Sequence, residues 1–249
     1  MPARPTLADA TTMWSPYCGA APAPGEWLAR WNGDPLLGLG FVLAVAMWSR
    51  WGDHEAKKSA TGAGLTALFL FLSPFCVLGS ALFTIRVVHD VILVALLAPL
   101  VMKAFALERR AVHGSLALYT AVHALVFLVW HAPPLYAAAM SYDAVFWAMQ
   151  ITITGTAAIW WAQVVRAPAA AAVGALLATM VAMGLLGALL TFARTALYAP
   201  HWLTTQAWGL SPLEDQQLAG VVMWAPASLI YLLAALKILY RSFSPEPAR

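Results

Sequence analysis

Seven long apolar runs divide this chain, and few charged residues interrupt them. A bilayer core takes about 20 apolar residues per helix, with a range of about 17–25. The apolar residues are continuous rather than alternating with polar ones, which argues against a transmembrane barrel. The sequence therefore predicts an all-α polytopic membrane bundle with seven transmembrane helices. The expected spans are Pro35–Trp51, Gly62–Phe83, Val87–Leu107, Val112–Trp130, Asp143–Val165, Ala169–Ala193 and Leu213–Tyr240.

The composition agrees with a membrane protein. Of the 249 residues, 62% are hydrophobic and 10% charged, whereas soluble domains have about 45–50% apolar and about 25% charged residues. These values exclude a disordered chain, a nucleic-acid-binding module and a typical cytosolic enzyme. No repeat or low-complexity segment divides the chain. We expect one membrane domain at 35–240, an extracytoplasmic tail at 1–34 and a cytoplasmic tail at 241–249.

The basic residues predict how the bundle is oriented. The loops after the first, third and fifth spans and the C-terminal end hold ten of the 14 basic residues, and cytoplasmic loops carry this excess. The N-terminus is then outside and the C-terminus cytoplasmic, which requires an odd number of spans. Residues 1–31 have no apolar core of a signal peptide. The larger set is Arg50, Lys57, Lys58, Lys103, Arg109, Arg110, Arg166, Lys237, Arg241 and Arg249, and the smaller is Arg4, Arg30, Arg86 and Arg194.

Polar and ionisable residues gather at the outer ends of the predicted spans. Such groups are costly inside a membrane, so each needs a partner or a function. A capping box at Ser211–Glu214 and the helix dipole give the acidic residues of the last span a structural role. The outer group comprises Cys76, His89, Asp90, His131, Asp143, Arg194, His201, Glu214 and Asp215. Of these, Asp215 is an outer-shell candidate for a metal site, and His201 is a secondary candidate.

His89 and His131 are the main candidates for a metal site, with Cys76 as a soft third ligand. Imidazole is the commonest metal ligand, and a nearby thiolate favours Cu(I). Asp90 either orients an imidazole from the outer shell or pairs with Arg86. Two structural alternatives remain open: the histidines are hydrogen-bonded packing residues, or they hold a haem between facing helices.

Other residues are either structural or secondary candidates for a metal site. His123 lies about 12 Å deeper than His131 along a helix, which predicts a separate interhelical hydrogen bond. Met149 and Met223 either fill gaps or line a thioether path for Cu(I). Cys18 is either a free ligand thiol or the disulfide partner of Cys76. No nucleotide-binding, hydrolase or metalloprotease motif is present, so we predict no catalytic residue and no enzyme.

The same residues lie in stretches that resemble the CtaG-type cytochrome c oxidase assembly factors, a family of seven-span membrane proteins. The most specific stretch is the last. The matching stretches are Trp31–Pro35, Ser73–Cys76, Leu82–Thr84, Arg86–His89, Ala98–Leu100, Trp130–Tyr136 and Trp208–Gly220 with Met223–Pro226.

This resemblance implies a role in assembling haem-copper oxidase, through copper delivery or metal-centre maturation at the periplasmic face of the inner membrane. The implied partners are oxidase subunits or other copper-assembly proteins, with no nucleic acid. Many relatives have a second histidine beside His89 or four residues before it, where this chain has Asp90 and Ile85. The alternatives are a copper or small-solute transporter, a haem-binding redox protein and a scaffold that binds no metal.

Overall fold

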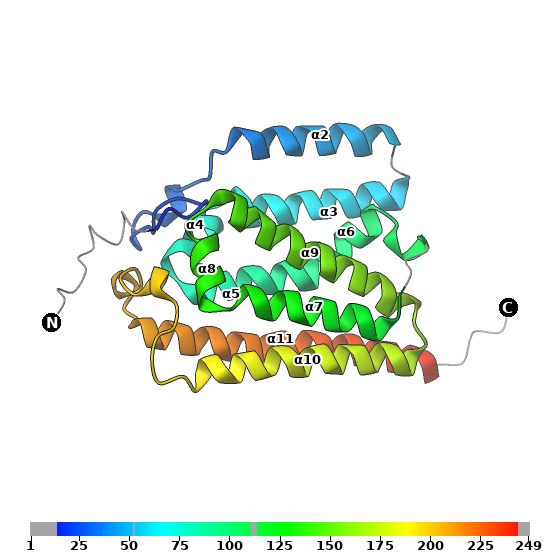
Figure 1. The fold of residues 1–249 in the computed structure, drawn as a ribbon. Helices are drawn as coiled ribbons and strands as arrows, with labels where there is room; N and C mark the ends of the chain where they lie inside the picture. The colour runs from blue at the N-terminus through cyan, green and yellow to red at the C-terminus, as the bar shows by residue number, and fades with distance from the viewer. Residues whose placement is uncertain (1–13, 52, 111–113, 244–249) are drawn as a thin grey trace.

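The computed structural model describes residues 14–51, 53–110 and 114–243, and within these ranges the chain is helical with no strand (Figure 1). Residues 1–13 of the tail predicted at 1–34 and residues 244–249 of the tail predicted at 241–249 lie outside the described residues, and Arg4 and Arg249 are among them. Val112, at the predicted start of the fourth span, also lies outside them. The long helices run side by side along one axis, so the start of α2 and the end of α11 lie at opposite ends of the bundle.

The helices follow the apolar runs closely, but several runs contain more than one element. The main elements are α2 (Pro35–Trp51), α3 (His54–Phe71), α4 (Pro74–Ala81), α5 (Phe83–Ile92), the π-helix η2 (Leu93–Leu97), α6 (Ala98–Ala104), α7 (Leu116–Trp130), α8 (Pro133–Ala139), α9 (Asp143–Arg166), α10 (Ala169–Thr191) and α11 (Pro212–Phe243). Four 3-10 turns, η1 (Trp27–Ala29), η3 (Leu107–Arg109), η4 (Ala199–His201) and η5 (Gln206–Trp208), lie in the connections.

Three continuous helical segments are long and apolar enough to cross a membrane: Phe83–Ala104, Ala169–Thr191 and Pro212–Phe243. Two bent pairs raise the number to five if each pair is one span. The bend is 44° between α3 and α4 and 75° between α7 and α8. The described chain is thus a helical membrane bundle with three to five candidate spans, and α2 is a shorter apolar helix.

Two predicted boundaries were wrong, and both changes move charged residues. α3 begins at His54 rather than Gly62, because Asp53 caps its first turn by accepting a 2.7 Å hydrogen bond from the Ala56 amide. α5 begins at Phe83 rather than Val87. Arg86, which we expected in an outer loop, is therefore a helical residue and only 1% exposed.

The bends occur where the sequence stops a helix. Ser73 caps α4 and Pro74 occupies its first turn, where a missing amide proton has no cost. Pro133 has the same position in α8, a short helix in a stretch that we expected to be a loop. Pro226 lies inside α11 without ending it. The capping box at the start of α11 is confirmed, since the Ser211 amide donates to Glu214 at 2.8 Å and the Glu214 amide donates to the Ser211 hydroxyl at 3.2 Å.

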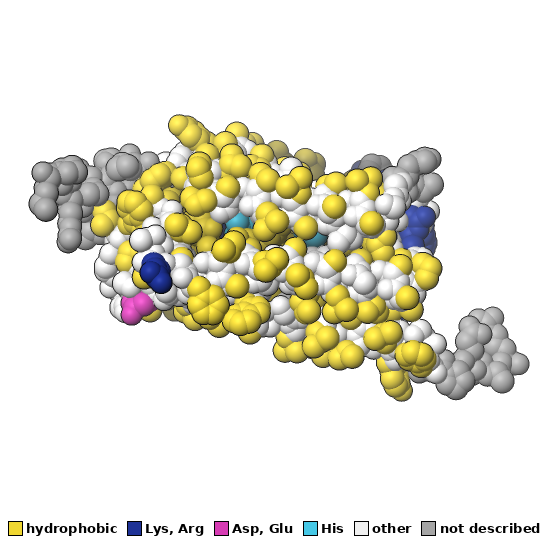
Figure 2. Space-filling view, turned by 60° about the horizontal axis from the view of Figure 1, so that its bottom comes forward, with side chains coloured by type: hydrophobic (Ala, Val, Ile, Leu, Met, Phe, Trp, Pro, Cys, Tyr) yellow, Lys and Arg dark blue, Asp and Glu magenta, His cyan; other side chains and the backbone are white. Residues whose placement is uncertain are grey.

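α10 and α11 approach each other at two glycines. A Cβ atom built on Gly220 would lie 2.6 Å from the carbonyl oxygen of Gly187, and one built on Gly187 would lie 2.8 Å from that of Gly220. Small residues allow such backbone contact between membrane helices. Large apolar side chains cover the face seen in Figure 2, and leucines such as Leu125 and Leu189 are exposed on the bundle surface. This surface is suited to lipid.

Candidate metal centre

His89 and His131 converge on Asp90 in the interior of the bundle. His89 Nδ1 lies 3.6 Å from one carboxylate oxygen of Asp90, and His131 Nε2 lies 3.7 Å from the other. The three side chains are at most 4% exposed. His89 and Asp90 come from α5, and His131 is the C-cap residue of α7 at its bend towards α8. The structure therefore brings together the two histidines that the sequence placed at one depth.

The end of α7 determines which ring nitrogen of His131 carries a proton. His131 Nδ1 lies 2.8 Å from the carbonyl oxygen of Phe127. A carbonyl oxygen only accepts hydrogen bonds, so Nδ1 is the donor, and in the neutral ring Nε2 has a lone pair. The Phe127 ring stacks on the imidazole with centroids 4.3 Å apart. The Tyr198 hydroxyl donates to the His131 carbonyl at 2.8 Å. These contacts hold the ring with its lone pair facing Asp90.

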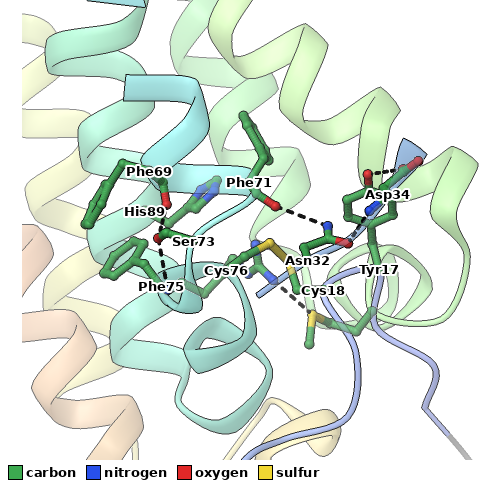
Figure 3. Close-up of a disulfide and its surroundings, with 12 residues drawn as sticks. Tyr17, Cys18, Asn32, Asp34, Phe69, Phe71, Ser73, Phe75, Cys76 and His89 are labelled. Carbon is green, nitrogen blue, oxygen red and sulfur yellow. Dashed lines mark hydrogen bonds between the residues drawn. A yellow bond between two sulfur atoms is a disulfide. The ribbon is translucent and has the colours of Figure 1, made fainter. Parts of the chain in front are cut away.

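His89 is held by aromatic rings rather than by hydrogen bonds. Its ring meets Phe71 edge-on at 5.2 Å and lies parallel to Phe75 at 6.3 Å, as Figure 3 shows for the side chains around the disulfide. Neither of its ring nitrogens makes a hydrogen bond within the described structure, and neither does Oδ1 of Asp90. Buried polar atoms without partners are costly. These atoms are therefore available to a ligand.

Arg86 lies three residues before His89 and four before Asp90, on the same side of α5. Its Nη2 atom lies 3.8 Å from the sulfur of Met140, and its guanidinium carbon lies 5.3 Å from the centre of the Phe146 ring. No ion pair joins Arg86 to Asp90 among the described residues, so that alternative was wrong; the Asp90 carboxylate instead lies close to the two imidazoles.

Cys18 and Cys76 form a disulfide across 58 residues of sequence, with Cα atoms 5.5 Å apart. The helix break after α3 places Cys76 in the separate helix α4, where the N-terminal segment passes (Figure 3). Of the two interpretations of Cys18, pairing is the one that the structure shows. Cys76 has no free thiolate in this state, which corrects its assignment as a third soft ligand.

Hydrogen bonds hold the segment before α2 over the end of α3. The Asn32 side-chain amide donates to the Phe71 carbonyl at 3.1 Å, and the Asn32 backbone amide donates to the Leu72 carbonyl at 2.9 Å. The Tyr17 hydroxyl donates to Asp34, and this hydrogen bond lowers the pKa of the carboxyl group. Burial and the Asp34 charge raise the pKa of Tyr17. The outer segment is thus fixed beside the residues that surround His89.

Asp215 and His201, two secondary candidates, lie in other contacts. The Asp215 carboxylate accepts hydrogen bonds from the backbone amides of Phe83 at 2.6 Å and Thr84 at 3.2 Å, so it caps α5 rather than contacting an imidazole. His201 Nε2 lies 2.7 Å from the Tyr136 hydroxyl, and burial lowers the pKa of His201 to about 3. Asp215 therefore acts on the helix that carries His89, and His201 belongs to a separate contact.

The methionine candidates differ from one another in position. Met223 lines a cavity of about 10 Å³ together with Asp90 and Met183, a volume that holds about one water molecule. Met183 accepts a 3.2 Å hydrogen bond from the Tyr231 hydroxyl. Met149 is a buried member of the hydrophobic core. The thioether groups of Met183 and Met223 thus share a small cavity with Asp90, and Met149 is not among the residues of that cavity.

His123 confirms the prediction of a separate interhelical hydrogen bond. Its Nδ1 atom lies 3.3 Å from the Thr156 hydroxyl of α9, and its ring stacks on Trp160. Sequence reasoning missed the buried positions of Arg86 and Gln150, each of which has polar atoms without hydrogen-bond partners. For Arg86, the signal was its spacing from His89 and Asp90 on one helix.

Within the described residues, no set of three or more His, Cys, Asp or Glu side chains stands ready to hold a metal ion. Each imidazole faces a different oxygen of Asp90, so the carboxylate lies between the two rings. The bundle therefore provides two contacts between an imidazole and a carboxylate, and both share Asp90. In the contact at His131, two hydrogen-bond acceptors face each other: the Nε2 atom and an Asp90 oxygen.

The model of one protein family matches residues 39–244, a range that includes His89, Asp90, His131 and the whole of α3 to α11. Its description is cytochrome c oxidase caa3 assembly factor, Caa3_CtaG. No curated protein and no solved structure matches this chain. The family match covers most of the sequence and agrees with the stretches that surround the buried cluster. The chain belongs to the family of cytochrome c oxidase caa3 assembly factors.

Proposed function

We propose that this assembly factor binds copper, as Cu(I), at His89, Asp90 and His131, and passes the ion to an oxidase subunit or another copper-assembly protein. The contact between His131 and Asp90 carries the proposal. The lone pair of His131 Nε2 faces a carboxylate oxygen at 3.7 Å, beyond the usual 2.7–3.2 Å of a hydrogen bond. Two acceptors that face each other in the interior of the bundle are stabilised by a cation between them.

Copper suits this donor set better than the other common ions do. Imidazole binds copper, and thioether sulfur is a soft ligand that favours Cu(I). Two donors about 2 Å from one ion lie roughly 3–4 Å apart, and both contacts of Asp90 are within that range. The carboxylate balances the charge of the ion where the bilayer excludes water. The thioethers of Met183 and Met223 line the cavity on the adjoining side of Asp90.

The disulfide makes this site suited to handover. With Cys18 and Cys76 joined, copper meets imidazole and carboxylate rather than a thiolate, which would hold Cu(I) more strongly. A partner with softer ligands can then take the ion. The protein acts by binding and release, with no catalytic step.

We infer that all seven helical units cross the inner membrane, with the N-terminus outside. The units are α2, α3 with α4, α5 to α6, α7 with α8, α9, α10 and α11. Basic residues collect at the end of the bundle that holds the start of α3 and the end of α9, which supports a cytoplasmic position for that end. The disulfide and the His–Asp cluster are then nearer the periplasmic face, where oxidising conditions maintain disulfides.

Copper analysis of purified protein under anaerobic conditions tests the proposal. After loading with Cu(I) and removal of excess ion, the wild type should retain copper, and the His89→Ala/His131→Ala variant should lose it. His123→Gln is the matched control, since it changes a membrane histidine outside the cluster. Equal copper in the wild type and the double variant would falsify the copper site at these histidines, and no copper in either would support a scaffold that binds no metal. A Soret band in the purified protein would support the haem alternative instead.

A further inference from the structure

α2 is attached to the bundle mainly at its two ends. At the outer end, Asn32 holds the preceding segment to the last residues of α3. At the other end, the Trp48 indole donates to the Ala104 carbonyl at 3.3 Å and packs edge-on against Phe105 at 4.8 Å. Figure 1 shows α2 standing apart from α3 along the length between these attachments. Residues of α2 between these attachments, such as Gly40 and Ala44, line a cavity.

This space is a cavity of about 1040 Å³ between α2, α3 and α6. Its charged lining residues are Asp34 at the outer end and Lys57 at the opposite end. The Thr61 hydroxyl, also in the lining, is satisfied by the carbonyl of Lys57 at 2.9 Å. The walls between the ends are apolar, with Leu37, Phe41, Ala44, Ala63, Leu68 and Val101 among their residues.

Small residues on the facing helices keep the cavity open. Gly40 of α2 and Gly64 of α3 both line it. A Cβ atom on Gly40 would meet nothing within 4 Å, and one on Gly64 would meet only the ring of Phe41 at 3.9 Å. In membrane proteins, small residues at such spacing usually bring helices into contact. Here they border a space that no side chain of the described residues fills.

The lining of the cavity favours narrow apolar groups. The cavity extends along α2 and α3 from Asp34 to Lys57, and the walls between these two residues are apolar. Flexible hydrocarbon chains are narrow enough to enter between the helices, and the apolar walls match them.

The charges decide which end receives a polar headgroup. Lys57 lies at the rim, with Arg50 in the last turn of α2 and Lys58 beside it. Asp53 and Glu55 are also near, so the three cations leave one net positive charge at this end. Asp34 at the outer end would repel an anionic headgroup. An anionic phosphate thus fits the Lys57 end alone.

We propose that this cavity binds the acyl chains of an anionic phospholipid whose phosphate lies at Lys57. With the orientation inferred above, the lipid comes from the cytoplasmic leaflet. The cavity does not include His89, Asp90 or His131, so this lipid site is independent of the copper proposal. Its occupant would wedge between α2 and α3 and fill the contact that the glycines leave open.

Lipid analysis of protein purified in a delipidating detergent tests the site. The wild type should retain an anionic phospholipid. Gly40→Leu and Ala44→Leu, which fill the cavity, should each lower retention about tenfold, as expected when roughly two methylene groups lose apolar contact. Gly38→Leu is the matched control: Gly38 is on the same helix, has nothing within 4 Å of a built Cβ and does not line the cavity. It should retain lipid as the wild type does.

Lys57→Gln tests the headgroup separately, and should remove the preference for anionic over zwitterionic lipid while chains are still retained. Copper binding by Gly40→Leu should remain that of the wild type, so a failed copper site and a failed lipid site give different results. Equal lipid retention by Gly40→Leu, Ala44→Leu and Gly38→Leu would overturn the proposal. Recovery of a polypeptide or a neutral lipid in the cavity would also overturn it.

Discussion

The Asp215 carboxylate accepts a 2.6 Å hydrogen bond from the backbone amide of Phe83, and this contact joins the start of α11 to the start of α5. The Thr84 hydroxyl donates in return to the Asp215 carbonyl at 2.8 Å. Because α5 carries His89 and Asp90, a residue that is distant from the cluster in sequence sets the position of the helix that builds it.

Replacing Asp215 with Ala should therefore destabilise the protein and weaken copper binding together. Loss of a buried, charged cap leaves two backbone amides without partners, a cost of about 2–3 kcal/mol. Thermal unfolding in detergent and copper retention measure the two effects. Glu214→Ala is the matched control, since the capping box of Glu214 is exposed and its loss is expected to cost less than the loss of the buried Asp215 cap. Equal effects of both variants would contradict the assigned role of Asp215.

Asp90→Asn should lower the affinity for Cu(I) while leaving the fold intact. The amide has nearly the same shape as the carboxylate but lacks the charge that balances an ion between the imidazoles. We expect a loss of about 10–100-fold, as for other carboxylates that support metal-bound histidines. Competition against a chromogenic Cu(I) chelator measures it. Unchanged affinity would remove Asp90 from the site.

Breaking the disulfide should destabilise the protein without abolishing copper binding. A closed loop of 58 residues corresponds to roughly 4 kcal/mol in the chain-entropy description. Cys18→Ser/Cys76→Ser should thus unfold at a lower temperature and retain Cu(I) through the imidazoles. Cys18→Ser alone leaves Cys76 as a free thiol. If only the single variant bound copper, the thiolate rather than the His–Asp cluster would be the principal donor.

The hydrogen bond between Tyr17 and Asp34 should make stability depend on pH at both extremes. Its effect on Asp34 lowers the pKa of the carboxyl group, so this contribution is present above the unfolded pKa of about 3.9 and is lost as pH falls through the lowered value. Tyr17 has a raised pKa, so its contribution is present below about pH 10 and is lost as pH rises further.

Thermal unfolding of the wild type and Tyr17→Phe across pH measures this contribution. The difference between the two proteins should be largest at neutral pH and should shrink in strong acid and strong alkali. Tyr142→Phe is a suitable control because Tyr142 is exposed. Equal stability of the two proteins at every pH would show that Tyr17 stabilises the protein by ring packing on Phe146 alone.

Gly220→Ala should separate α10 from α11. The new methyl group would lie within 2.6 Å of the Gly187 carbonyl and 2.7 Å of the Thr191 amide, and these backbone atoms can move only with their helix. We expect a loss of about 1–3 kcal/mol in thermal or denaturant unfolding. Gly174→Ala on α10 meets nothing within 4 Å and should leave stability nearly unchanged. Similar unfolding of both variants would show that the helices adjust freely.

Local patterns predicted the helices well. The bounds of α2 agree with the first apolar run, and α10 ends within two residues of the expected end. A continuous apolar run that ends at a helix-breaking residue predicts a helix from a short stretch of sequence alone. α5 begins earlier than expected because Asp215 caps its first turn at the Phe83 amide, and Asp215 belongs to α11. A contact of that range has no local signature.

The candidate cluster was partly predictable for the same reason. The sequence analysis placed His89 and His131 at one depth, and the structure brings them together on Asp90. The depth of a residue can be inferred from its position in a predicted span. The state of Cys76 could not be read in this way, because the bend at Ser73 and the path of the N-terminal segment together decide whether Cys18 reaches it. Arg86 was misplaced when the start of its helix was misplaced.

The partner of His131 Nδ1 is a main-chain carbonyl, and every residue type supplies that group. No substitution at position 127 can remove the acceptor while α7 ends where it does. The backbone path therefore determines the tautomer of the His131 ring, and this tautomer does not depend on which side chain stands at position 127. Only a mutation that shifts the end of the helix could reverse the two nitrogens of this imidazole.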